Sequence, residues 1–589
     1  MFNLNNPIPF LFREMWKFSQ DRKKYVVLVY FLSTMSNVLG LILPLIIANI
    51  FNIIQETGVN SNNIKTILFY ISLILIIEIV KWLFHGPSRI IERTNAFHIK
   101  NNYRKFMFNG IISLPQKWHT DNHSGNTIDK IDKGCDALKK FSAETYLIID
   151  SLFNMIGAYL IILYFNIHAS YTVLIFLFLI WIIIDKYDKK LISLQKERMI
   201  KENQISAKLY DSISNITTII ILRLEKLISK SLFLKFMSPY KVSVADFKIN
   251  EYKWFFVGIL VRSFMVIILA TYVLSSYYGT GIIMAGTLFA LWSYVEKINN
   301  QFFRFSMYYS KWVTQKASIE NGKVISDQFE NIKQPKQIDM HNWKELEIKN
   351  LNFGYDNKVN LKNISLTIKR NEKVAFIGES GSGKTTFLKI LRDLYPIESG
   401  HIFLDNKKLK YNFGQIKNSI SLIPQEPEIF DSTILNNITL GISHKLSYIR
   451  QLAKVARFDS VAMRLPNQYK SKIREKGVNL SGGEKQRLAL VRGILASVDK
   501  QIVLLDEPTS SVDSVNESMI YQTLFSKFKN KTIISSIHRL HLLPMFDRII
   551  YFEAGKIIAN GTLDELIKQS PKFKKQWNLY LKSVKKHLD

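Results

Sequence analysis

Three short stretches in the second half of the sequence combine glycines, hydroxyls and charged side chains at spacings that suit phosphate chemistry. In the first, Gly378–Thr385 reads Gly, four residues, then Gly-Lys-Thr, and it follows the short apolar run Lys373–Ile377. Such a loop between a strand and a helix aims successive backbone N–H groups at one anion, so it predicts a pyrophosphate site. Lys384 would bridge the outer phosphates, and the Thr385 hydroxyl would hold Mg²⁺. The residues of this expected loop are Gly378, Glu379, Ser380, Gly381, Ser382, Gly383, Lys384, Thr385 and Thr386.

A pair of carboxylates follows a second apolar run. Gln501–Leu505 is typical of a buried parallel strand, and it ends in Asp506 and Glu507. Asp506 is placed to hold Mg²⁺ through water, which leaves Glu507 free to polarise a water against a γ-phosphate. The alternative is a carboxylate pair that caps the next helix. It is the weaker interpretation because strand, loop and pair occur in the order that phosphate chemistry needs.

The third stretch, Asn479–Leu490, begins a helical pattern with two adjacent glycines. Glycine costs about 1 kcal/mol inside a helix, so Ser481, Gly482 and Gly483 are expected at a helix N-terminus rather than within it. The backbone N–H groups of such an end are bare and attract an anion.

Composition limits the class of protein that carries these residues. The chain has 589 residues, too many for one core, and it divides into a half with long apolar runs and a half of short strands, glycine turns and charged helices. Its single cysteine, Cys135, excludes an internal disulfide framework. The net charge of +31 is spread over both halves, with 37 Lys/Arg against 23 Asp/Glu through residue 330 and 42 against 25 beyond it. We therefore expect no nucleic-acid partner, and contact with membrane lipids instead.

The first half contains six apolar runs long enough to be membrane spans. They lie near Tyr25–Ile54, Thr66–Phe84, Tyr146–Phe165, Ser170–Ile184, Trp254–Tyr277 and Gly281–Val295. The short connections Gln55–Ile64, Asn166–Ala169 and Tyr278–Gly281 contain no Lys or Arg, whereas the long connections His85–Lys140 and Asp185–Lys253 are rich in both. By the positive-inside rule, the long connections and both termini are expected in the cytosol of a cell with a cytoplasmic (inner) membrane. The segment Pro9–Phe18 ahead of the first span predicts an interfacial helix, with an ordinary cytosolic helix as the alternative.

Helical periodicity continues past the membrane edge in both long connections, through Ile90–Gly110 and Leu191–Ile213. Each connection is expected to turn through a short cross-piece that docks onto the second half of the chain. The first cross-piece is expected near Leu114–Gly125, where Pro and Gly stand at its ends, and the second near Leu222–Ser231.

These motifs together resemble those of the ATP-binding-cassette (ABC) ATPases. The resemblance rests on Leu480–Arg487, on the loop Gly378–Thr385, and on four single residues: Gln425, Asp513, His538 and Tyr355. The six spans ahead of them resemble the membrane domain of an ABC exporter half-transporter, and Arg474–Gly477 is similar to a stretch that exporters carry near their cross-pieces. Two residues depart from that pattern, Glu484 where exporters more often have Gln and Arg474 where they have Gly.

The resemblance implies a fold and a mechanism. The fold is an all-α polytopic membrane domain of six transmembrane helices over residues 1–330, a linker over 331–345, and an α/β P-loop nucleotide-binding domain over 346–589. Gln425 and His538 would join Glu507 in catalysis, with Gln425 also near the metal, while Tyr355 would stack on adenine and Asp513 would lie at the nucleotide. Ser481–Gly483 would bind the γ-phosphate of an ATP held by another chain, so the chain should pair with a second half-transporter, as a homodimer or in a heterodimer. ATP binding and hydrolysis would then drive an exporter or lipid flippase.

Two rival classes stay open. An ABC importer component would need a separate binding protein, and a chromosome-organising ATPase would need a coiled-coil insertion in place of the spans. The transported substrate is not specified by the sequence. Glu78, Lys81, Arg262 and Glu296 are ionisable residues in or near the spans, and they either form structural ion pairs or contact that substrate.

Overall fold

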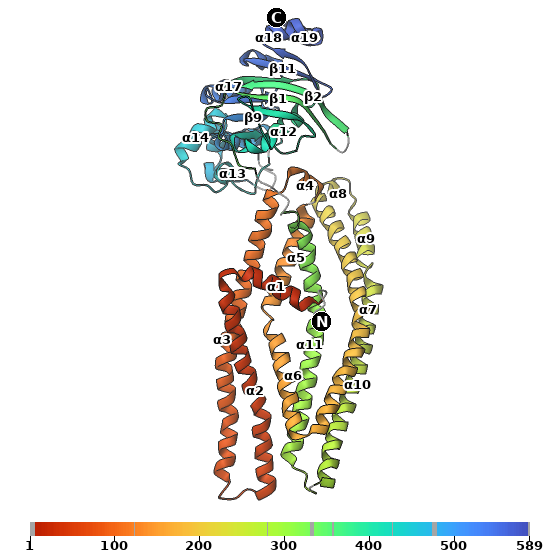
Figure 1. Ribbon diagram of the computed structural model, residues 1–589. Helices are drawn as coiled ribbons and strands as arrows, with labels where there is room; N and C mark the ends of the chain where they lie inside the picture. The colour runs from red at the N-terminus through yellow and green to blue at the C-terminus, as the bar shows by residue number, and fades with distance from the viewer. Residues whose placement is uncertain are drawn as a thin grey trace. The chain divides into compact units, whose positions relative to one another are not determined.

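The fold is described from a computed structural model over residues 6–122, 124–279, 281–329, 335–355, 358–426, 428–473 and 480–586. The chain divides into two compact units, one entirely helical and one of mixed α/β structure, which are described separately (Figure 1). The expected exporter-like stretch Arg474–Gly477 lies outside the described residues.

The helical unit consists of long helices joined by short connections (Figure 1). Its long helices are α2 (Lys23–Thr57), α3 (Ile64–Ser113), α6 (Tyr146–Phe165), α7 (Ile167–Ser214), α10 (Tyr240–Gly279) and α11 (Ala285–Ser326). Its shorter elements are α1 (Pro7–Ser19), η1 (Gln20–Arg22), α5 (Ser124–Ser142), α8 (Ile216–Ile221) and α9 (Glu225–Phe236). The short helix α4 (Gln116–Asp121) is divided, with the segment Pro115–Trp118 grouped with the α/β unit. The helices α3 and α7 run without a break through both a predicted span and its predicted cytosolic continuation, which confirms that continuation.

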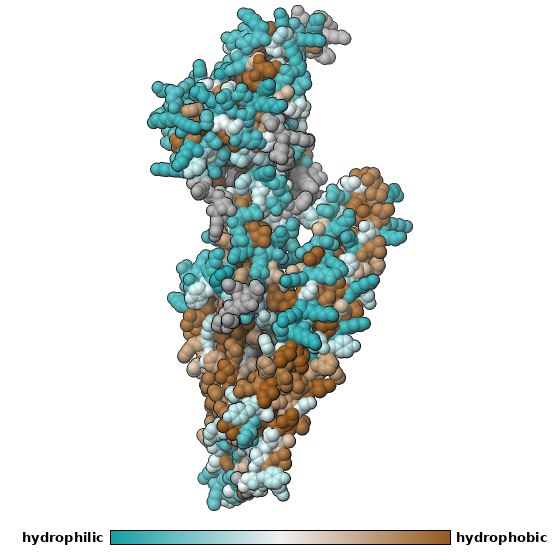
Figure 2. Space-filling model, turned by 45° about the vertical axis from the view of Figure 1, so that its right-hand side comes forward, coloured by the Kyte–Doolittle hydropathy of each residue, from teal (hydrophilic) through white to brown (hydrophobic). Residues whose placement is uncertain are grey.

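Five helical stretches of the described chain are long and apolar enough to cross a membrane, and they contain the first five predicted spans. The sixth predicted span is only partly helical, because α11 begins at Ala285 rather than at Gly281. Its apolar part is short, since Glu296 and Lys297 follow soon after the helix begins. Large apolar side chains such as Leu75, Ile79 and Trp82 on α3 are more than half exposed, and Figure 2 shows apolar residues gathered on the surface of this unit. Such a surface suits contact with lipid.

The two cross-pieces differ in how well the sequence predicts them. The first is the short helix α4, which begins directly after Pro115, within the predicted segment. The second short helix, α8, ends at Ile221, before the predicted segment Leu222–Ser231, which instead contains a turn and the start of α9. The chain leaves α8 through Arg223, whose φ of +53° is the left-handed conformation that ends helices, and no glycine marks the position.

Buried polar contacts join the long helices. The Glu92 carboxylate on α3 accepts hydrogen bonds from the Thr145 hydroxyl (2.6 Å) and the Tyr146 N–H (2.9 Å) at the start of α6, and it also contacts Arg89. Within the predicted cytosolic connection Asp185–Lys253, Lys253 of α10 lies 3.0 Å from Asp188 of α7 and is 2% exposed. A buried ammonium needs such a partner, so this pair fixes the register of α10 against α7.

The α/β unit contains two larger sheets and a small ladder. The parallel sheet has the strand order β12-β11-β3-β10-β9-β6, with only β12 antiparallel to its neighbour, and the second sheet, ordered β2-β1-β4-β5, is antiparallel. The strands are β1 (Glu345–Tyr355), β2 (Lys358–Lys369), β3 (Lys373–Ile377), β4 (Ser399–Leu404), β5 (Lys407–Lys408), β6 (Ile420–Ile423), β7 (Ser432–Thr433), β8 (Lys472–Ile473), β9 (Ile502–Asp506), β10 (Thr532–Ser536), β11 (Arg548–Glu553) and β12 (Lys556–Gly561). The ladder pairs β7 with β8.

Helices surround the parallel sheet on both faces. They are α12 (Lys384–Leu391), α13 (Ile434–Thr439), α14 (Leu446–Val455), α15 (Asp459–Arg464), α16 (Gly482–Ala496), α17 (Ser514–Lys527), α18 (Leu563–Gln569) and α19 (Pro571–Lys586). Strand β9 is buried along its whole length, with Val503 and Leu505 in one hydrophobic core and Ile502 and Leu504 in the other. This alternation confirms the buried parallel strand that the sequence predicts.

We expect the Lys253–Asp188 pair to be required for the stability of the helical unit. Lys253→Met leaves Asp188 as an uncompensated charge and should destabilise the protein by about 3 kcal/mol, whereas Lys253→Met combined with Asp188→Leu should recover most of that loss. Thermal unfolding of the purified protein in detergent measures both variants. A single Lys253→Met variant that unfolds at the temperature of the parent protein would contradict the structural role of the pair.

Candidate nucleotide site

The expected phosphate loop turns sharply between β3 and α12. Gly378, Gly381 and Gly383 have backbone φ angles of +144°, +80° and +105°, which residues other than glycine rarely adopt. A Cβ at Gly378 would lie 2.2 Å from the carbonyl oxygen of Phe552 in β11, the neighbour of β3 in the sheet. This close approach also requires glycine at position 378. The sequence pattern and the backbone therefore agree on a loop whose N–H groups line a concavity.

Lys384 is the first residue of α12 and is 4% exposed. Its ammonium donates hydrogen bonds to the carbonyl oxygens of Gly378 (2.8 Å) and Glu379 (3.1 Å), inside the turn of the loop. Burial lowers the pKa of Lys384, and the nearby carboxylates Glu507 and Asp506 act in the opposite direction. A positive charge is thus held at the centre of the loop, where it can bind phosphate oxygens.

Asp506, the last residue of β9, accepts two hydrogen bonds on one carboxylate oxygen. The Thr385 hydroxyl donates to it at 2.9 Å, and the Ser536 hydroxyl at the end of β10 donates at 2.8 Å. No group of three His, Cys, Asp or Glu side chains suited to a metal occurs among the described residues. Mg²⁺ in nucleotide sites is bound through one or two protein oxygens plus substrate phosphates, so one carboxylate beside one hydroxyl fits that donor set.

Glu507 comes directly after β9 and has a φ of +45°. This conformation costs about 1 kcal/mol or more in a residue with a Cβ, and it persists only where the surroundings hold it. Its carboxylate lies 2.6 Å from Nε2 of His538 and accepts a hydrogen bond from the Gln425 amide at 3.0 Å. The structure therefore brings together all three residues predicted to act in catalysis, Glu507, His538 and Gln425.

Most of these residues line one cavity of about 410 Å³, whereas Gly378 and Asp506 are not among its lining residues. Its lining residues are Asn360, Ser380, Gly381, Ser382, Gly383, Lys384, Thr385, Thr386, Gln425, Glu507 and His538. The Ser382 hydroxyl oxygen is buried there and has no hydrogen-bond partner among the described residues. A polar loop with a buried cation, a spare hydroxyl and a carboxylate across the cavity is suited to the phosphate end of a nucleotide.

Tyr355, the expected adenine-stacking residue, ends β1 and is not among the residues that line this cavity. Its ring meets those of Phe353 and Tyr395 edge-on, with centroids 4.8 and 5.2 Å apart. Burial raises the pKa of Tyr355, while a hydrogen bond with Thr386 of the phosphate loop acts in the opposite direction. Stacking on adenine stays a prediction.

Ser481, Gly482 and Gly483 form the expected helix N-terminus, with Ser481 as the N-cap of α16. The Ser481 N–H donates to the Glu484 carboxylate (2.9 Å), and the Glu484 N–H donates to the Ser481 hydroxyl (3.3 Å), which is a capping box. Glu484, which departs from the family pattern, thus caps the N-terminus of its own helix. Its carboxylate also forms an ion pair with Arg464 at 3.1 Å.

The N-terminus of α16 does not line the cavity at the phosphate loop of its own chain. None of its three residues is among those that line the 410 Å³ cavity, whereas Gly482 lines a second cavity of about 390 Å³ with Gln486, Ser510 and Ser511. Gln425 lines both cavities. Asp513 is the N-cap of α17. Hydrogen bonds from Asn516 lower the pKa of its carboxyl group.

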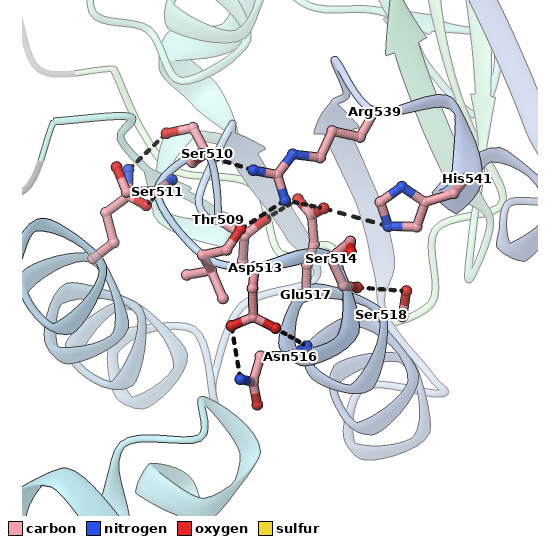
Figure 3. A network of polar contacts seen from close by, with 12 residues as sticks. Thr509, Ser510, Ser511, Asp513, Ser514, Asn516, Glu517, Ser518, Arg539 and His541 are labelled. Atoms are coloured by element: carbon pink, nitrogen blue, oxygen red, sulfur yellow. Dashed lines mark hydrogen bonds and ion pairs between the residues drawn. The ribbon is translucent and has the colours of Figure 1, made fainter. Parts of the chain in front are cut away.

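The sequence analysis did not predict the polar contacts that surround the segment after Glu507. They involve Gln486 of α16, whose amide donates to the Ser510 hydroxyl (2.7 Å) and accepts from the Ser511 N–H (2.8 Å). They also involve Glu517 of α17 and Arg539, which are paired at 3.1 Å (Figure 3). The only signal for Arg539 in the sequence is its place next to His538, and Glu517 carries no signal, because α17 lies against these loops only in the folded unit.

Comparison with known proteins agrees with this geometry. Residues 26–302 match the family described as ABC transporter transmembrane region, and residues 361–510 match the family described as ABC transporter. The chain is 27% identical to a multidrug resistance-like ATP-binding protein, MdlB, of Buchnera aphidicola, over 95% of this chain and 96% of that protein. It is 26% identical to a putative export ATP-binding/permease protein of Rickettsia bellii, over 89% and 92% of the two chains.

The fold is also found in a solved structure described as a bacterial Atm1-family ABC exporter with ATP bound. The TM-score is 0.82 at 18% identity, and the match covers 95% of this chain and 99% of that one. A transmembrane region and an ATPase domain occur in one chain, in the order found in its full-length relatives. The chain therefore belongs to the ABC transporters, as an exporter-type half-transporter that binds and hydrolyses ATP.

Proposed function

We propose that two copies of this chain form a homodimeric exporter or lipid flippase in the cytoplasmic membrane, with both termini in the cytosol. The proposed domains are residues 1–330 for transport, 331–345 as linker and 346–589 for ATP hydrolysis. The observation that supports a dimer is the separation of the two anion-binding motifs, because the N-terminus of α16 does not line the cavity of its own phosphate loop. A heterodimer with a related chain is the alternative. An importer is less favoured because the full-length relatives are described as export or resistance proteins.

In this proposal ATP lies between the phosphate loop of one chain and the α16 N-terminus of the other. The loop N–H groups and Lys384 hold the β- and γ-phosphates, and Ser481, Gly482 and Gly483 of the second chain bind the γ-phosphate from the opposite side. The intact nucleotide then stabilises the closed dimer, and hydrolysis followed by phosphate release removes the shared anion. Closing and opening of the dimer would be transmitted to the membrane helices through the cross-pieces, which include α4.

For hydrolysis, Glu507 accepts a proton from the attacking water. Its carboxylate is already oriented by Gln425 and His538, at 3.0 and 2.6 Å, which reduces the reorganisation needed in the transition state. Thr385 and Asp506, with Gln425 nearby, would hold Mg²⁺, which neutralises charge that develops on the phosphate oxygens when it is bound.

The ionisable residues of the spans form pairs. Lys81 lies 3.1 Å from Glu78 on α3, and Arg262 of α10 lies 3.2 Å from Glu296 of α11. Pairing satisfies these charges within the helical unit and supports their structural interpretation over direct substrate contact. The substrate class is therefore left open between lipids, peptides and drugs, and transport into inverted vesicles with such a panel would identify it.

Glu507→Gln should abolish turnover while ATP binding is retained. The amide has the same shape as the carboxylate but cannot accept the proton of water, so steady-state hydrolysis should fall by about 100-fold or more. The variant should also accumulate as a closed dimer with ATP, which would be measured as ATP retained by the detergent-solubilised protein after free nucleotide is removed. Hydrolysis within about threefold of the parent rate would remove Glu507 from this role.

A mixed dimer tests whether each site is shared between chains. Ser481→Arg places a cation where the γ-phosphate meets the helix N-terminus, and Lys384→Ala removes the charge of the loop, so each homodimer should be nearly inactive. A mixed dimer of one Ser481→Arg chain and one Lys384→Ala chain has one site with both lesions and one site with neither. It should trap nucleotide at the intact site and keep up to about half of the activity. Absence of trapping in the mixed dimer, where the parent traps nucleotide, argues against shared sites.

The orientation in the membrane can be tested with single cysteines in a chain whose Cys135 has been replaced. Cysteines at Asn60, between α2 and α3, and at Ser276, near the end of α10, should react with a membrane-impermeant thiol reagent on intact cells. A cysteine at Asn122, beside α4, should react only after the membrane is opened. Reaction at Asn122 on intact cells would reverse the proposed orientation.

A further inference from the structure

The buried carboxylate of Glu517 contacts two chain segments, one directly after Glu507 and one directly after His538. Glu517 of α17 is 5% exposed and is not among the residues that line the nucleotide cavity. Its Oε1 accepts a hydrogen bond from the Thr509 hydroxyl at 2.6 Å, and its Oε2 accepts one from Nη1 of Arg539 at 3.1 Å (Figure 3). Thr509 is the second residue after Glu507, and Arg539 directly follows His538.

Arg539 extends these contacts to the segment that follows Glu507. Its guanidinium donates to the carbonyl oxygens of Val512 (2.6 Å) and Ser510 (3.2 Å) as well as to Glu517. The planar fork of arginine suits several acceptors at fixed angles, which a lysine could not satisfy together. The segment 509–512 and the loop after β10 are therefore tied to the same point on α17.

The strained backbone of Glu507 explains why such ties are needed. On the upstream side, Glu507 is fixed by β9 and by the hydrogen bond from its N–H to the Ser536 hydroxyl at 3.0 Å. On the downstream side, Thr509 is 2% exposed, and it lines a cavity of about 90 Å³ together with Glu507 and Glu517. The contacts of Thr509 and Arg539 with Glu517 restrain the chain beside this cavity, since a strained conformation persists only when its surroundings over-determine it.

We propose that Glu517 is a positioning residue for ATP hydrolysis, acting through Thr509 and Arg539. It holds the Glu507 carboxylate and the His538 imidazole in their mutual geometry, without touching the nucleotide. This inference rests on the proposed roles of Glu507 and His538. A displacement of about 1 Å at a reacting group can lower a rate by up to about 100-fold, so loss of this anchor should affect the chemical step rather than nucleotide binding.

The experiment uses full-length transporter in proteoliposomes with two matched pairs of variants. Thr509→Val keeps the shape of the side chain but removes the hydroxyl, whereas Thr509→Ser keeps the hydroxyl. Glu517→Gln removes the charge that pairs with Arg539. Ser518→Ala, at the next position of α17, is its control, because among the described residues the Ser518 hydroxyl bonds only to the Ser514 carbonyl within the helix.

Thr509→Val and Glu517→Gln should each lower kcat for ATP hydrolysis about tenfold, with KM for ATP and the affinity for a non-hydrolysable ATP analogue within about twofold of the parent. Thr509→Ser and Ser518→Ala should keep kcat within about twofold. In the Thr509→Val/Glu517→Gln double variant, kcat should lie within about twofold of kcat of the slower single variant, because both changes disrupt the same anchor, the Glu517 carboxylate.

Three results would overturn the proposal. The first is a kcat for Thr509→Val within about twofold of the parent rate. The second is an additive double variant. The third is a loss of activity accompanied by a lowered unfolding temperature and a raised KM, which would mean that Glu517 only stabilises the fold.

Glu507→Gln, assayed in parallel, separates the positioning role of Glu517 from the proposed catalytic role of Glu507. If it is inactive while the Glu517 and Thr509 variants are fully active, the positioning role fails and the proposed function stands; if it hydrolyses ATP like the parent, the proposed role of Glu507 itself fails.

Discussion

The parallel pairing of β3, β10 and β9 is the constraint on which the candidate site depends. In register, Ser536 of β10 lies opposite Phe376 of β3 on one side and Asp506 of β9 on the other. The carboxyl ends of the three strands therefore meet at one edge of the sheet, and the loops that leave them carry the phosphate loop, Glu507 and His538. A ligand site at this edge is the general outcome for open parallel sheets. Here it also places the Ser536 hydroxyl where it can bond both Asp506 and the Glu507 N–H.

The contacts around Glu507 show how the unit maintains a strained catalytic geometry. The residue has a left-handed backbone and is fixed through its N–H, its carboxylate and the chain that follows it. The fixing groups come from the end of β10, from the loops after β6 and β10, and from α17. Each of these contacts is modest in free energy, but together they leave the carboxylate few alternative positions. The network of Gln486 adds a connection from α16 to the same segment, through Ser510 and Ser511.

The helical unit reaches a definite packing by different means. Its spans expose large apolar side chains to lipid, which supplies little drive for one helix to associate with another. Buried polar contacts therefore specify how the helices pair, as with Glu92 between α3 and α6 and Lys253 between α10 and α7. Such contacts are costly if unsatisfied, so they favour one arrangement of the helices over alternatives of similar packing.

Local chemistry in the sequence was enough to predict much of this protein. Glycine spacing predicts the loop Gly378–Thr385, apolar runs predict β3, β9 and five helices able to cross a membrane, and the adjacent glycines of α16 predict its N-terminus, because each of these features depends on neighbouring residues. The start of α11 was less predictable because the apolar run from Gly281 continues unbroken into the helix, and the position of α8 because no glycine or proline marks it. Only the tertiary structure decided which distant side chains reach Glu507, because Gln425, His538, Thr509 and Glu517 are brought together by strand order and by the docking of α17. It likewise decided that Ser481–Gly483 lies away from the cavity of its own phosphate loop, since that separation depends on how α16 packs and not on any residue within the motif.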